Sequence, residues 1–215
     1  MSELIGVYGA SGFGREVMPL VRKQYPYLND ESFVFVDDAR TQDILNGYKI
    51  LTYSDFLEID AQDKKITIAI ADSKIRQLLA ERIAKSSIQQ VSVKAENTTV
   101  LDSVNIGEGS ILCHHTCLTS NIKIGKFFHA NIYSYIAHDC VIGDYVTFAP
   151  RVSCNGNIHI HDHAYIGTGA VIKQGTLDKP LIIGKGAIVG MGAVVTKDVP
   201  AGAVVIGNPA KPLVK

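Results

Sequence analysis

The chain has 215 residues, of which 47% are hydrophobic and 20% charged, a balance typical of a folded protein rather than a disordered one. Lys plus Arg and Asp plus Glu total 21 each, so the zero net charge gives no signature of binding to nucleic acid or to an acidic membrane. The sequence has neither a signal-peptide pattern nor an apolar run of about 20 residues, and its four cysteines do not make a disulfide scaffold. We therefore expect a cytoplasmic protein with reduced thiols.

Strand and helix signals alternate in the first half of the chain. Short apolar runs at 4–9, 32–38 and 65–72 predict strands. Apolar residues at helical spacing predict helices over 14–25 and 74–85, the second with an apolar face of Ile75, Leu78, Leu79 and Ile83. We expect an α/β domain over residues 1–95, with a small and largely parallel sheet.

A period of six replaces this pattern from about residue 100. Thirteen successive hexads place an aliphatic or small residue at Val100, Ile106, Leu112, Leu118, Ile124, Ala130, Ile136, Ile142, Phe148, Cys154, Ile160, Ile166 and Ile172. A second residue, usually small or β-branched, follows four positions later, from Val104 to Thr176. The repeat breaks at TLDKPLI (176–182) and resumes at Ile183, Val189, Val195 and Ala201. Period six predicts a β-solenoid over residues 96–215, with three short faces per coil.

The break at 177–182 contains Asp178 and Pro180, which cannot continue a face of the solenoid. We expect a loop that leaves the solenoid. It is either a tolerated surface insertion or part of a binding site.

The segment GASGFGRE (9–16) joins a predicted strand to a predicted helix. Its glycine spacing differs from the dinucleotide motif GxGxxG, and one interpretation is a tight turn and nothing more. The other interpretation is a phosphate loop, with backbone amides at the helix N-terminus. Asp37 and Asp38 end the next strand, where carboxylates accept hydrogen bonds from a ribose or a base. They favour a site for one nucleotide diphosphate.

The segment IADSKIRQ (70–77) follows the third predicted strand. Ser73 is expected to cap the next helix. Asp72 and Arg76 are candidate nucleotide contacts, because an arginine at this position could reach a phosphate.

Two histidine-rich segments, CHHTC (113–117) and IHIHDH (158–163), suggest zinc. The hexad register argues against it, because His159 and His161 point outward from one strand face between the inward Ile158 and Ile160. We expect no metal.

His138 lies between the inward positions Ile136 and Cys140, so its side chain should project outward near a corner of the coil. It is then either a surface histidine or a base, oriented and made more basic by the neighbouring Asp139.

These motifs together resemble the sialic-acid O-acetyltransferase-like and bacillosamine-type nucleotide-sugar N-acetyltransferases, which are hexapeptide-repeat acyltransferases. The resemblance rests on GASGFG, the Asp pair, IADSKIR, HDCVIGD, APRVSCNGN, GTGAVIKQG, GMGAVVTKDVP and GNPAK, and it covers nearly the whole chain. It implies a left-handed β-helix, a homotrimer with active sites between neighbouring solenoids, and acetyl-CoA as co-substrate. The implied acceptor is the 4-amino group of a nucleotide-linked 4,6-dideoxy sugar, most simply a UDP sugar, for a bacterial surface glycan.

The resemblance also implies roles for single residues. His138 matches the general base and Asp139 its acidic partner, Asn131 a residue lining the sugar site, and Gly156 a backbone amide near the acetyl carbonyl. Further matches are Gly9, Ser11 and Gly12 in the phosphate loop, Asp37 and Asp38 at the nucleoside, and Gly167, Gly190, Asn208, Pro209 and Lys211 along the CoA groove.

Some members carry a second His nine residues after the base, where this chain has Thr147. The expected reaction is direct attack of the amine on the thioester, with Cys140 and Cys154 placed inward and unsuited as nucleophiles. Two alternatives remain: an O-acetyltransferase for a sialic-acid-type sugar, and a trimeric solenoid without catalytic activity.

Overall fold

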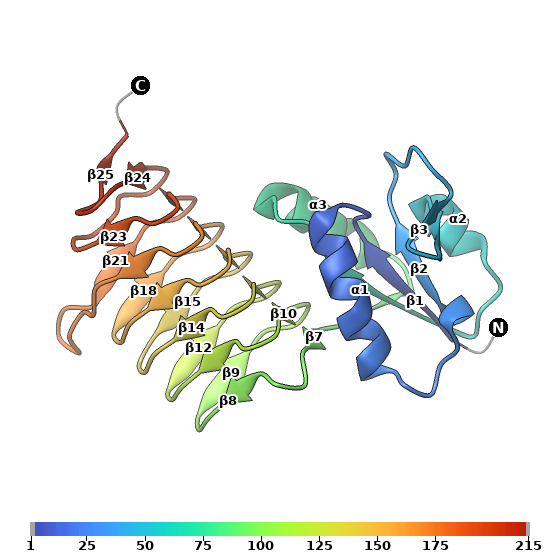
Figure 1. Cartoon of the computed structure of the whole chain (residues 1–215), viewed down its shortest axis with the longest axis horizontal. Helices are drawn as coiled ribbons and strands as arrows, with labels where there is room; N and C mark the ends of the chain where they lie inside the picture. The colour runs from blue at the N-terminus through green and yellow to red at the C-terminus, as the bar shows by residue number, and fades with distance from the viewer. Residues whose placement is uncertain (1–2, 214–215) are drawn as a thin grey trace. The chain divides into compact units, whose positions relative to one another are not determined.

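The computed structural model describes residues 3–213 of the chain (Figure 1). They form two compact units, which divide between Lys94 and Ala95. The two domains expected from the sequence also include residues 1–2 and 214–215, which lie outside the described residues.

The first unit contains one sheet, with the strand order β3-β4-β2-β1-β5-β6. Its elements are β1 (Glu3–Tyr8), α1 (Gly12–Gln24), a 3-10 turn (Asp30–Ser32), β2 (Phe33–Val36), β3 (Ile44–Leu45), β4 (Tyr48–Leu51), α2 (Tyr53–Glu58), β5 (Asp63–Ile68), α3 (Ser73–Ile83), β6 (Gln89–Gln90) and β7 (Val93–Lys94). Every neighbouring pair in the sheet is parallel except β3 with β4. The three predicted strands and two predicted helices are present, whereas β3, β4 and α2 carried no recognised signal.

The parallel pairing brings three loops to one edge of this sheet. Strands β2 and β5 flank β1 on either side, with Tyr8 paired to Val36 and to Ile68. The chain therefore leaves all three strands at the same edge, where the Gly9 N–H donates to the Val36 carbonyl at 2.8 Å. Side chains from segments far apart in the sequence meet here, as in other open α/β sheets.

Helix α3 buries only part of the face that was predicted. Ile83 is buried as expected, but Ile75 and Leu78 are 48% and 66% exposed, and Arg76 and Ala80 are buried as well. The reason is the Arg76 side chain, whose guanidinium lies inside and donates to the Ile70 and Ala71 carbonyls at 2.6 and 3.1 Å. A buried charged group with hydrogen-bond partners has displaced two apolar side chains.

The second unit is a parallel β-helix of short strands. The strands are β8 (Thr99–Val100), β9 (Val104–Ile106), β10 (Ile111–Leu112), β11 (Cys117–Leu118), β12 (Ile122–Ile124), β13 (His129–Ala130), β14 (Tyr135–Ile136), β15 (Val141–Ile142), β16 (Thr147–Phe148), β17 (Ser153–Cys154), β18 (Ile158–Ile160), β19 (Tyr165–Ile166), β20 (Val171–Ile172), β21 (Leu181–Ile183), β22 (Ile188–Val189), β23 (Val194–Val195), β24 (Val204–Ile206) and β25 (Lys211–Pro212).

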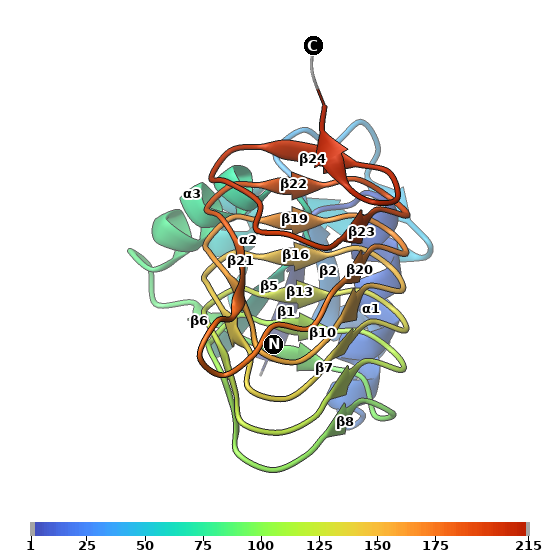
Figure 2. The same ribbon diagram turned by 90° about the vertical axis from the view of Figure 1, so that its left-hand side faces the viewer.

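These strands build three sheets around one apolar column. The first sheet contains β10, β13, β16, β19, β22, β24 and β25, the second β8, β11, β14, β17, β20 and β23, and the third β9, β12, β15, β18 and β21. Figure 2 shows strands of the first sheet stacked above one another. In the second sheet Leu118 pairs with Ile136 and Ile136 with Cys154, so inward residues 18 positions apart are neighbours. Their burial on one another stabilises each coil.

Three corners join the sheets and recur in every coil. The first corner leads from the first sheet to the second, the second corner from the second sheet to the third, and the third corner back to the first. Most turns contain one residue with positive φ, for example Asn121, Asp139 and Asn157 at the second corner, with φ of 58°, 58° and 56°. Asn and Asp tolerate this left-handed conformation better than most other residues, because their side chains bond locally.

The hexad register fails at three predicted positions. Ile106 is 37% exposed, and Thr176 and Ala201 are exposed as well. Thr176 already belongs to the loop that interrupts the repeat. Ala201 is displaced because the last coil is short: Val189 pairs with Val205, sixteen residues on, where Ile142 pairs with Ile160, eighteen on. Val199 and Val205 therefore occupy the inward positions.

Candidate active site

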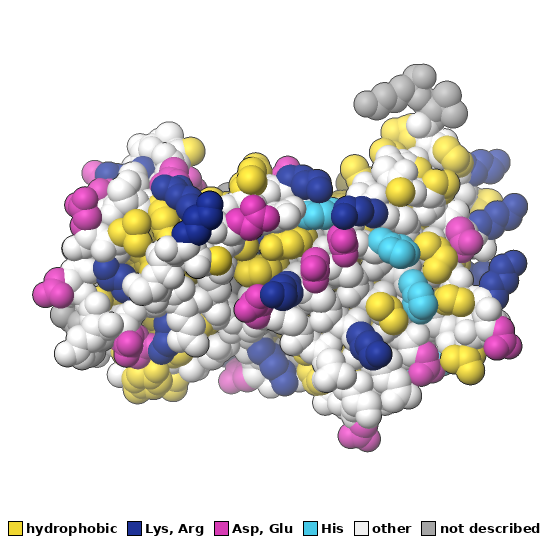
Figure 3. Space-filling view, turned by 180° about the vertical axis from the view of Figure 1, so that it is seen from behind, with side chains coloured by type: hydrophobic (Ala, Val, Ile, Leu, Met, Phe, Trp, Pro, Cys, Tyr) yellow, Lys and Arg dark blue, Asp and Glu magenta, His cyan; other side chains and the backbone are white. Residues whose placement is uncertain are grey.

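His138 lies at the second corner, in the turn between β14 and β15. Its side chain is 48% exposed, while Ile136 and Cys140 on either side are buried. The predicted outward orientation is therefore confirmed. Figure 3 shows histidine side chains at the surface of the solenoid among acidic and basic groups.

Asp139 holds the imidazole of His138 in a defined orientation. Its Oδ2 lies 2.7 Å from His138 Nδ1. Asp139 is itself fixed in the solenoid, because its N–H donates to the Ser120 carbonyl at 3.1 Å. An ionised carboxylate only accepts hydrogen bonds, so it places the proton of a neutral imidazole on Nδ1. Nε2 is then left with a lone pair that can accept a proton.

Gly156 lies directly beside the His138 ring, one coil further along the chain. A Cβ on Gly156 would fall 2.6 Å from Cε1 and 2.7 Å from Nε2 of His138. The Asn157 N–H donates to the His138 carbonyl at 3.0 Å, which ties the two turns together. Only glycine leaves room for the imidazole in this position.

A hydrogen-bonded pair supports the turn of Gly156. The Tyr135 hydroxyl donates to Asn155 Oδ1 at 2.9 Å, and Asn155 Nδ2 donates to the Ile172 carbonyl at 2.8 Å. Neither Tyr135 nor Asn155 was predicted from the sequence as a site residue. Their positions 20 residues apart follow from the length of a coil, which places them on adjacent turns.

The other predicted acetyl-transfer residues lie at the first corner. Asn131 begins the turn between β13 and β14, and Gly167 and Gly190 begin the corresponding turns after β19 and β22. The segment with Asn208 and Pro209 also crosses this corner, because Val194 N–H donates to the Gly207 carbonyl and Ala210 N–H donates to the Val194 carbonyl. Lys211 follows in β25. Within one chain, the second sheet thus lies between these first-corner residues and His138 at the second corner.

Gly167 is needed for the packing of the coils. A Cβ there would lie 2.6 Å from the Met191 nitrogen and 2.8 Å from the Gly190 carbonyl carbon. Its presence in the sequence is therefore explained without a ligand. Gly190 is crowded by the Ile206 side chain, which a Cβ on Gly190 would approach to 2.7 Å.

Cys140 and Cys154 are both buried in the apolar column, as predicted. The Cys140 thiol donates to the Asn155 carbonyl at 3.2 Å. The hydrogen bond with Cys140 and complete burial raise the pKa of the Cys154 thiol well above its usual value. The hydrogen bond with Cys154 lowers the pKa of the Cys140 thiol. Cys140 is nevertheless completely buried in the apolar column, where a substrate cannot reach its sulfur.

Thr147 occupies the position of the expected second histidine and is buried in β16. Between residues 3 and 213, no group of three or more His, Cys, Asp or Glu side chains is arranged to hold a metal. In the same range, no helix is long and apolar enough to cross a bilayer.

The glycine loop of the first unit opens helix α1. Ser11 is the N-cap residue, and Ser11 and Gly12 are exposed. Gly14 is required by the turn, because a Cβ there would lie 1.8 Å from the Gly9 carbonyl oxygen, whereas a Cβ on Gly12 would meet only Arg15, at 3.9 Å. The open side of the loop is thus at Ser11 and Gly12, where the helix N-terminus favours an anion.

Asp37 and Asp38 follow β2 and have different partners. Asp37 accepts hydrogen bonds from the N–H groups of Ala10 and Ala39, both at 3.0 Å, so it shapes the glycine loop. Asp38 accepts from the Tyr53 N–H at 2.8 Å, from the Tyr8 hydroxyl at 2.8 Å and from Arg82 at 2.7 Å.

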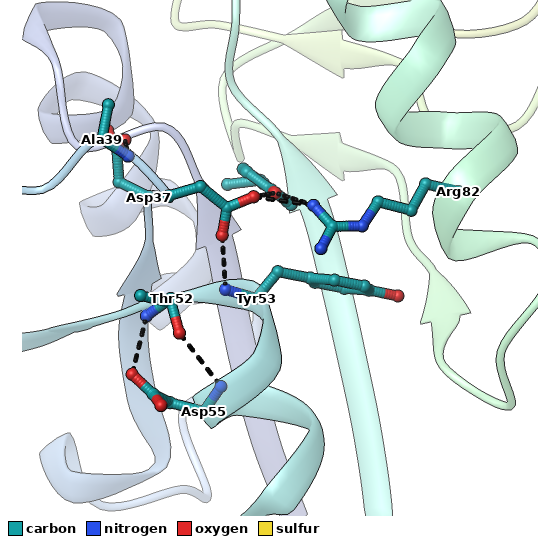
Figure 4. A network of polar contacts seen from close by, with 8 residues as sticks. Asp37, Ala39, Thr52, Tyr53, Asp55 and Arg82 are labelled. Carbon is teal, nitrogen blue, oxygen red and sulfur yellow. Dashed lines mark hydrogen bonds and ion pairs between the residues drawn. The ribbon is translucent and has the colours of Figure 1, made fainter.

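Figure 4 shows a network of polar contacts from close by, with the guanidinium of Arg82 lying over the Tyr53 ring. Arg82 is 4.3 Å from the ring centroid, and its side chain is 47% exposed. Arg82, Tyr8 and Tyr53 were not predicted from the sequence as site residues. A basic residue in the last turn of a helix is an ordinary capping signal, and nothing in the sequence connects it with a carboxylate 44 residues away.

The network also changes the protonation of its members. Partial burial raises the pKa of Asp38, but hydrogen bonds from Tyr53, Tyr8 and Arg82 outweigh it, and the net pKa is below the usual value. Burial and the hydrogen bond to Asp38 raise the pKa of Tyr8 far above its usual range. Asp38 is thus a carboxylate with a cation beside it at neutral pH.

Asp72 and Arg76 each have a structural role at the start of α3. Asp72, rather than Ser73, is the N-cap of α3, and its side chain accepts from the N–H groups of Lys74 and Ile75 at 2.9 and 3.0 Å. Arg76 is completely buried, so its charge is not presented at the surface as a phosphate contact requires.

Comparison with known proteins identifies the family of the chain. Residues 4–83 match the family described as PglD N-terminal domain. The chain is 49% identical over 210 residues to a GDP-perosamine N-acetyltransferase of Escherichia coli O157:H7, covering 97% of this chain and 95% of that protein. The chain belongs to the nucleotide-sugar N-acetyltransferases of the hexapeptide-repeat family. It is therefore an acetyltransferase, as expected from the sequence.

Solved structures confirm the fold of this nucleotide-sugar N-acetyltransferase. WeeI from Acinetobacter baumannii AYE is 68% identical with a TM-score of 0.97, over 99% of this chain and 100% of that one. The acetyltransferase domain of PglB from Neisseria gonorrhoeae FA1090, in complex with acetyl coenzyme A, is 27% identical with a TM-score of 0.84 over 99% and 100% of the two chains. The predicted α/β domain followed by a left-handed β-helix is correct.

Proposed function

We propose that the protein transfers the acetyl group of acetyl-CoA to the 4-amino group of GDP-perosamine, with His138 as general base. The donor is supported by the similar PglB domain, whose structure contains acetyl coenzyme A. The acceptor is supported by the 49% identity to a GDP-perosamine N-acetyltransferase over nearly the full length of both chains. Perosamine is a 4-amino-4,6-dideoxyhexose, so the reacting group is the one expected from the sequence.

The nucleotide is the point at which this proposal departs from the sequence-based expectation. The resemblance favoured a UDP-linked sugar, while the named relative favours GDP. Arg82 offers a physical reason for a guanine. Its half-exposed guanidinium carries further N–H donors, and guanine presents two adjacent acceptors, O6 and N7, that match an arginine fork.

The proposed catalytic role rests on one observation: the His138 imidazole is exposed, and its Nδ1 lies 2.7 Å from Asp139 Oδ2. The neutral amine of the sugar attacks the thioester carbonyl while Nε2 of His138 takes its proton. Asp139 stabilises the imidazolium that forms. The negative charge on the carbonyl oxygen is then placed near the backbone N–H of Gly156, in the role of an oxyanion donor. The C–S bond of the thioester then breaks, and CoA leaves as its thiol with the proton that the His138 imidazolium returns.

In this proposal the first unit binds the nucleotide. The exposed Ser11–Gly12 turn receives a phosphate, and the network of Asp38, Tyr53 and Arg82 receives the nucleoside. Asp37 and Gly9 shape the loop. Asp72 and Arg76 hold the start of α3, and we assign them no direct contact with the nucleotide.

We also propose that the enzyme works as a homotrimer. His138 and Gly156 lie at the second corner, whereas Asn131, Gly167 and Gly190 lie at the first. A narrow solenoid cannot bring these two corners together within one chain, but the first corner of one subunit can face the second corner of its neighbour. Light scattering at assay concentration should give three times the mass of the chain, and an active monomer would contradict this part.

The same proposal places the enzyme in the cytoplasm, where both co-substrates are available, in the synthesis of a bacterial surface glycan. Its test is an assay of thiol release from acetyl-CoA, with GDP-perosamine, a UDP-linked 4-amino-4,6-dideoxy sugar and free sialic acid as acceptors. The highest kcat/KM is expected for GDP-perosamine. A higher value for either of the other acceptors would reject GDP-perosamine as the substrate.

A further inference from the structure

The loop that interrupts the hexads lies at the corner that carries His138. It connects β20 of the second sheet to β21 of the third, as the turn of His138 connects β14 to β15. The Gly175 N–H donates to the Gly156 carbonyl at 3.0 Å, and the Leu181 N–H donates to the Asn157 carbonyl at 3.1 Å. The loop is therefore the layer directly beyond Gly156, which itself lies against the His138 ring.

The loop has a built conformation of its own. Thr176 and Lys179 close a turn by exchanging backbone hydrogen bonds of 3.0 and 3.2 Å. The Thr176 hydroxyl also accepts from the Lys179 N–H at 3.1 Å. At its far side, Asp198 Oδ1 accepts from the Ile182 N–H at 2.9 Å, which fastens the loop to the next coil. A loop with these bonds can shape a ligand site.

A pocket of about 460 Å³ lies between this loop and the next coil. Three lysines line it, Lys173 before the loop, Lys179 within it and Lys197 on the next coil, and all three side chains are exposed. Asp198 is the one acidic residue among the lining residues, and it is already bonded to the loop backbone. Three ammonium groups around one cavity favour a ligand with more than one negative charge.

The distance between the pocket and His138 indicates whether the diphosphate of the nucleotide sugar or that of acetyl-CoA fits the pocket. Gly156, the loop and Lys197 lie one, two and three coils beyond His138, on the C-terminal side. Coils repeat at the spacing of neighbouring strands, so the pocket is roughly 10–15 Å from His138 along the axis. In a nucleotide sugar, the diphosphate is attached directly to the sugar ring that carries the reacting amine. In acetyl-CoA, a long pantetheine arm separates the diphosphate from the thioester, which suits the observed separation.

We propose that this pocket binds the diphosphate of acetyl-CoA through Lys173, Lys179 and Lys197. The insertion is then an anchor for the donor. It fixes the far end of CoA while the pantetheine arm runs along the second corner toward His138. This inference rests on the proposed role of His138, because the position of the pocket has meaning only relative to the reacting thioester.

The test compares two donors that share the pantetheine thioester and differ in the phosphates, acetyl-CoA and S-acetylpantetheine. In the double variant Lys179→Ala/Lys197→Ala, KM for acetyl-CoA should rise about ten-fold or more, since each ammonium lost removes a charge-assisted bond to phosphate. KM for S-acetylpantetheine and for the nucleotide sugar should stay within two-fold of wild type, and so should kcat. Lys185→Ala is the matched control, because Lys185 is an exposed lysine at the third corner.

Three results would overturn the proposal. Equal losses for both donors would mean that the loop only supports the fold. A rise in KM for the nucleotide sugar alone would assign the pocket to the acceptor's phosphates. An unchanged KM for acetyl-CoA would mean that Lys179 and Lys197 do not bind its diphosphate.

Calorimetric titration with CoA and with pantetheine separates this inference from the proposed reaction. It measures donor binding without any acceptor, so it tests the CoA site independently of which sugar is acetylated. The variant Lys179→Arg/Lys197→Arg, which keeps both charges, should restore CoA affinity if charge is what the pocket supplies.

Discussion

The imidazole of His138 rests against the backbone of Gly156, and a Cβ at Gly156 would come within 2.6 Å of the ring. This contact between neighbouring coils fixes one side of the ring, and the hydrogen bond to Asp139 fixes its edge. The orientation of the His138 ring therefore depends on the absence of a side chain at Gly156 as well as on the Asp139 carboxylate.

Replacing Gly156 with Ala should reduce kcat by about 10- to 100-fold, since small displacements of a catalytic group cost rate in this range. The atoms that the new Cβ meets belong to the mobile end of the His138 side chain, so the fold should survive with a nearly unchanged Tm. Steady-state kinetics and thermal denaturation on the same sample check both parts. Wild-type kcat in this variant would mean that the observed ring position is not the catalytic one.

Asp139→Asn should lower kcat/KM by roughly 10- to 100-fold, which is less than removal of the base, because the carboxylate orients and stabilises the imidazolium without reacting. Asn is the suitable substitution here, because the backbone φ of Asp139 is +58° and Asn tolerates this conformation. Activity equal to wild type would assign the Asp139 hydrogen bond to packing alone.

Asp38→Asn should raise KM for the nucleotide sugar and leave KM for acetyl-CoA within two-fold of wild type. The substitution removes the charge that holds Arg82 over the Tyr53 ring. Initial rates with each substrate varied in turn measure the two constants. Equal increases in both would contradict the assignment of the nucleotide to the first unit.

The same variant gives a pH test of the Asp38 network. The folded-state pKa of Asp38 is below its usual value, so the ionised carboxylate contributes stability above about pH 4. This contribution is lost as the pH falls through the folded-state pKa. The Tm difference between wild type and Asp38→Asn should therefore be largest near neutral pH and shrink below about pH 4. A Tm difference that grows on acidification would mean that the ionised Asp38 carboxylate does not stabilise the fold.

Cys140→Ala should keep most of the activity and lose about 1–2 kcal/mol of unfolding free energy. The thiol is buried and donates to the Asn155 carbonyl, so its loss weakens packing beside the site without removing a reacting group. Intact-protein mass spectrometry during turnover should find no acetylated enzyme. Trapping of acetyl-Cys140 would replace direct attack with a covalent route.

Much of the solenoid could be predicted from the sequence because each inward position depends on local spacing. Ile136 and Cys140 could be placed on the inside, and His138 on the outside, from the hexads alone. The prediction failed where a coil changes length, as at Ala201, since Val189 pairs with Val205, sixteen residues on, and the hexad period does not indicate this shortening.

The nucleotide side of the site was less predictable, because its contacts join distant segments. Asp38 could be proposed from its place at a strand end. Its partners Tyr8, Tyr53 and Arg82 are 30, 15 and 44 residues away and come from three other elements. Arg76 was placed wrongly for a related reason: its burial depends on the carbonyl groups of Ile70 and Ala71, which helical periodicity does not include.

The most direct test of the account is the kcat of His138→Ala with saturating acetyl-CoA and GDP-perosamine at neutral pH. The side chain is half-exposed and fills no space in the apolar column, so Tm should be unchanged. Loss of the general base should reduce kcat by about 10²- to 10⁴-fold, and the loss should shrink as rising pH deprotonates the amine itself. A folded His138→Ala protein that keeps near wild-type kcat at neutral pH would contradict the proposed mechanism.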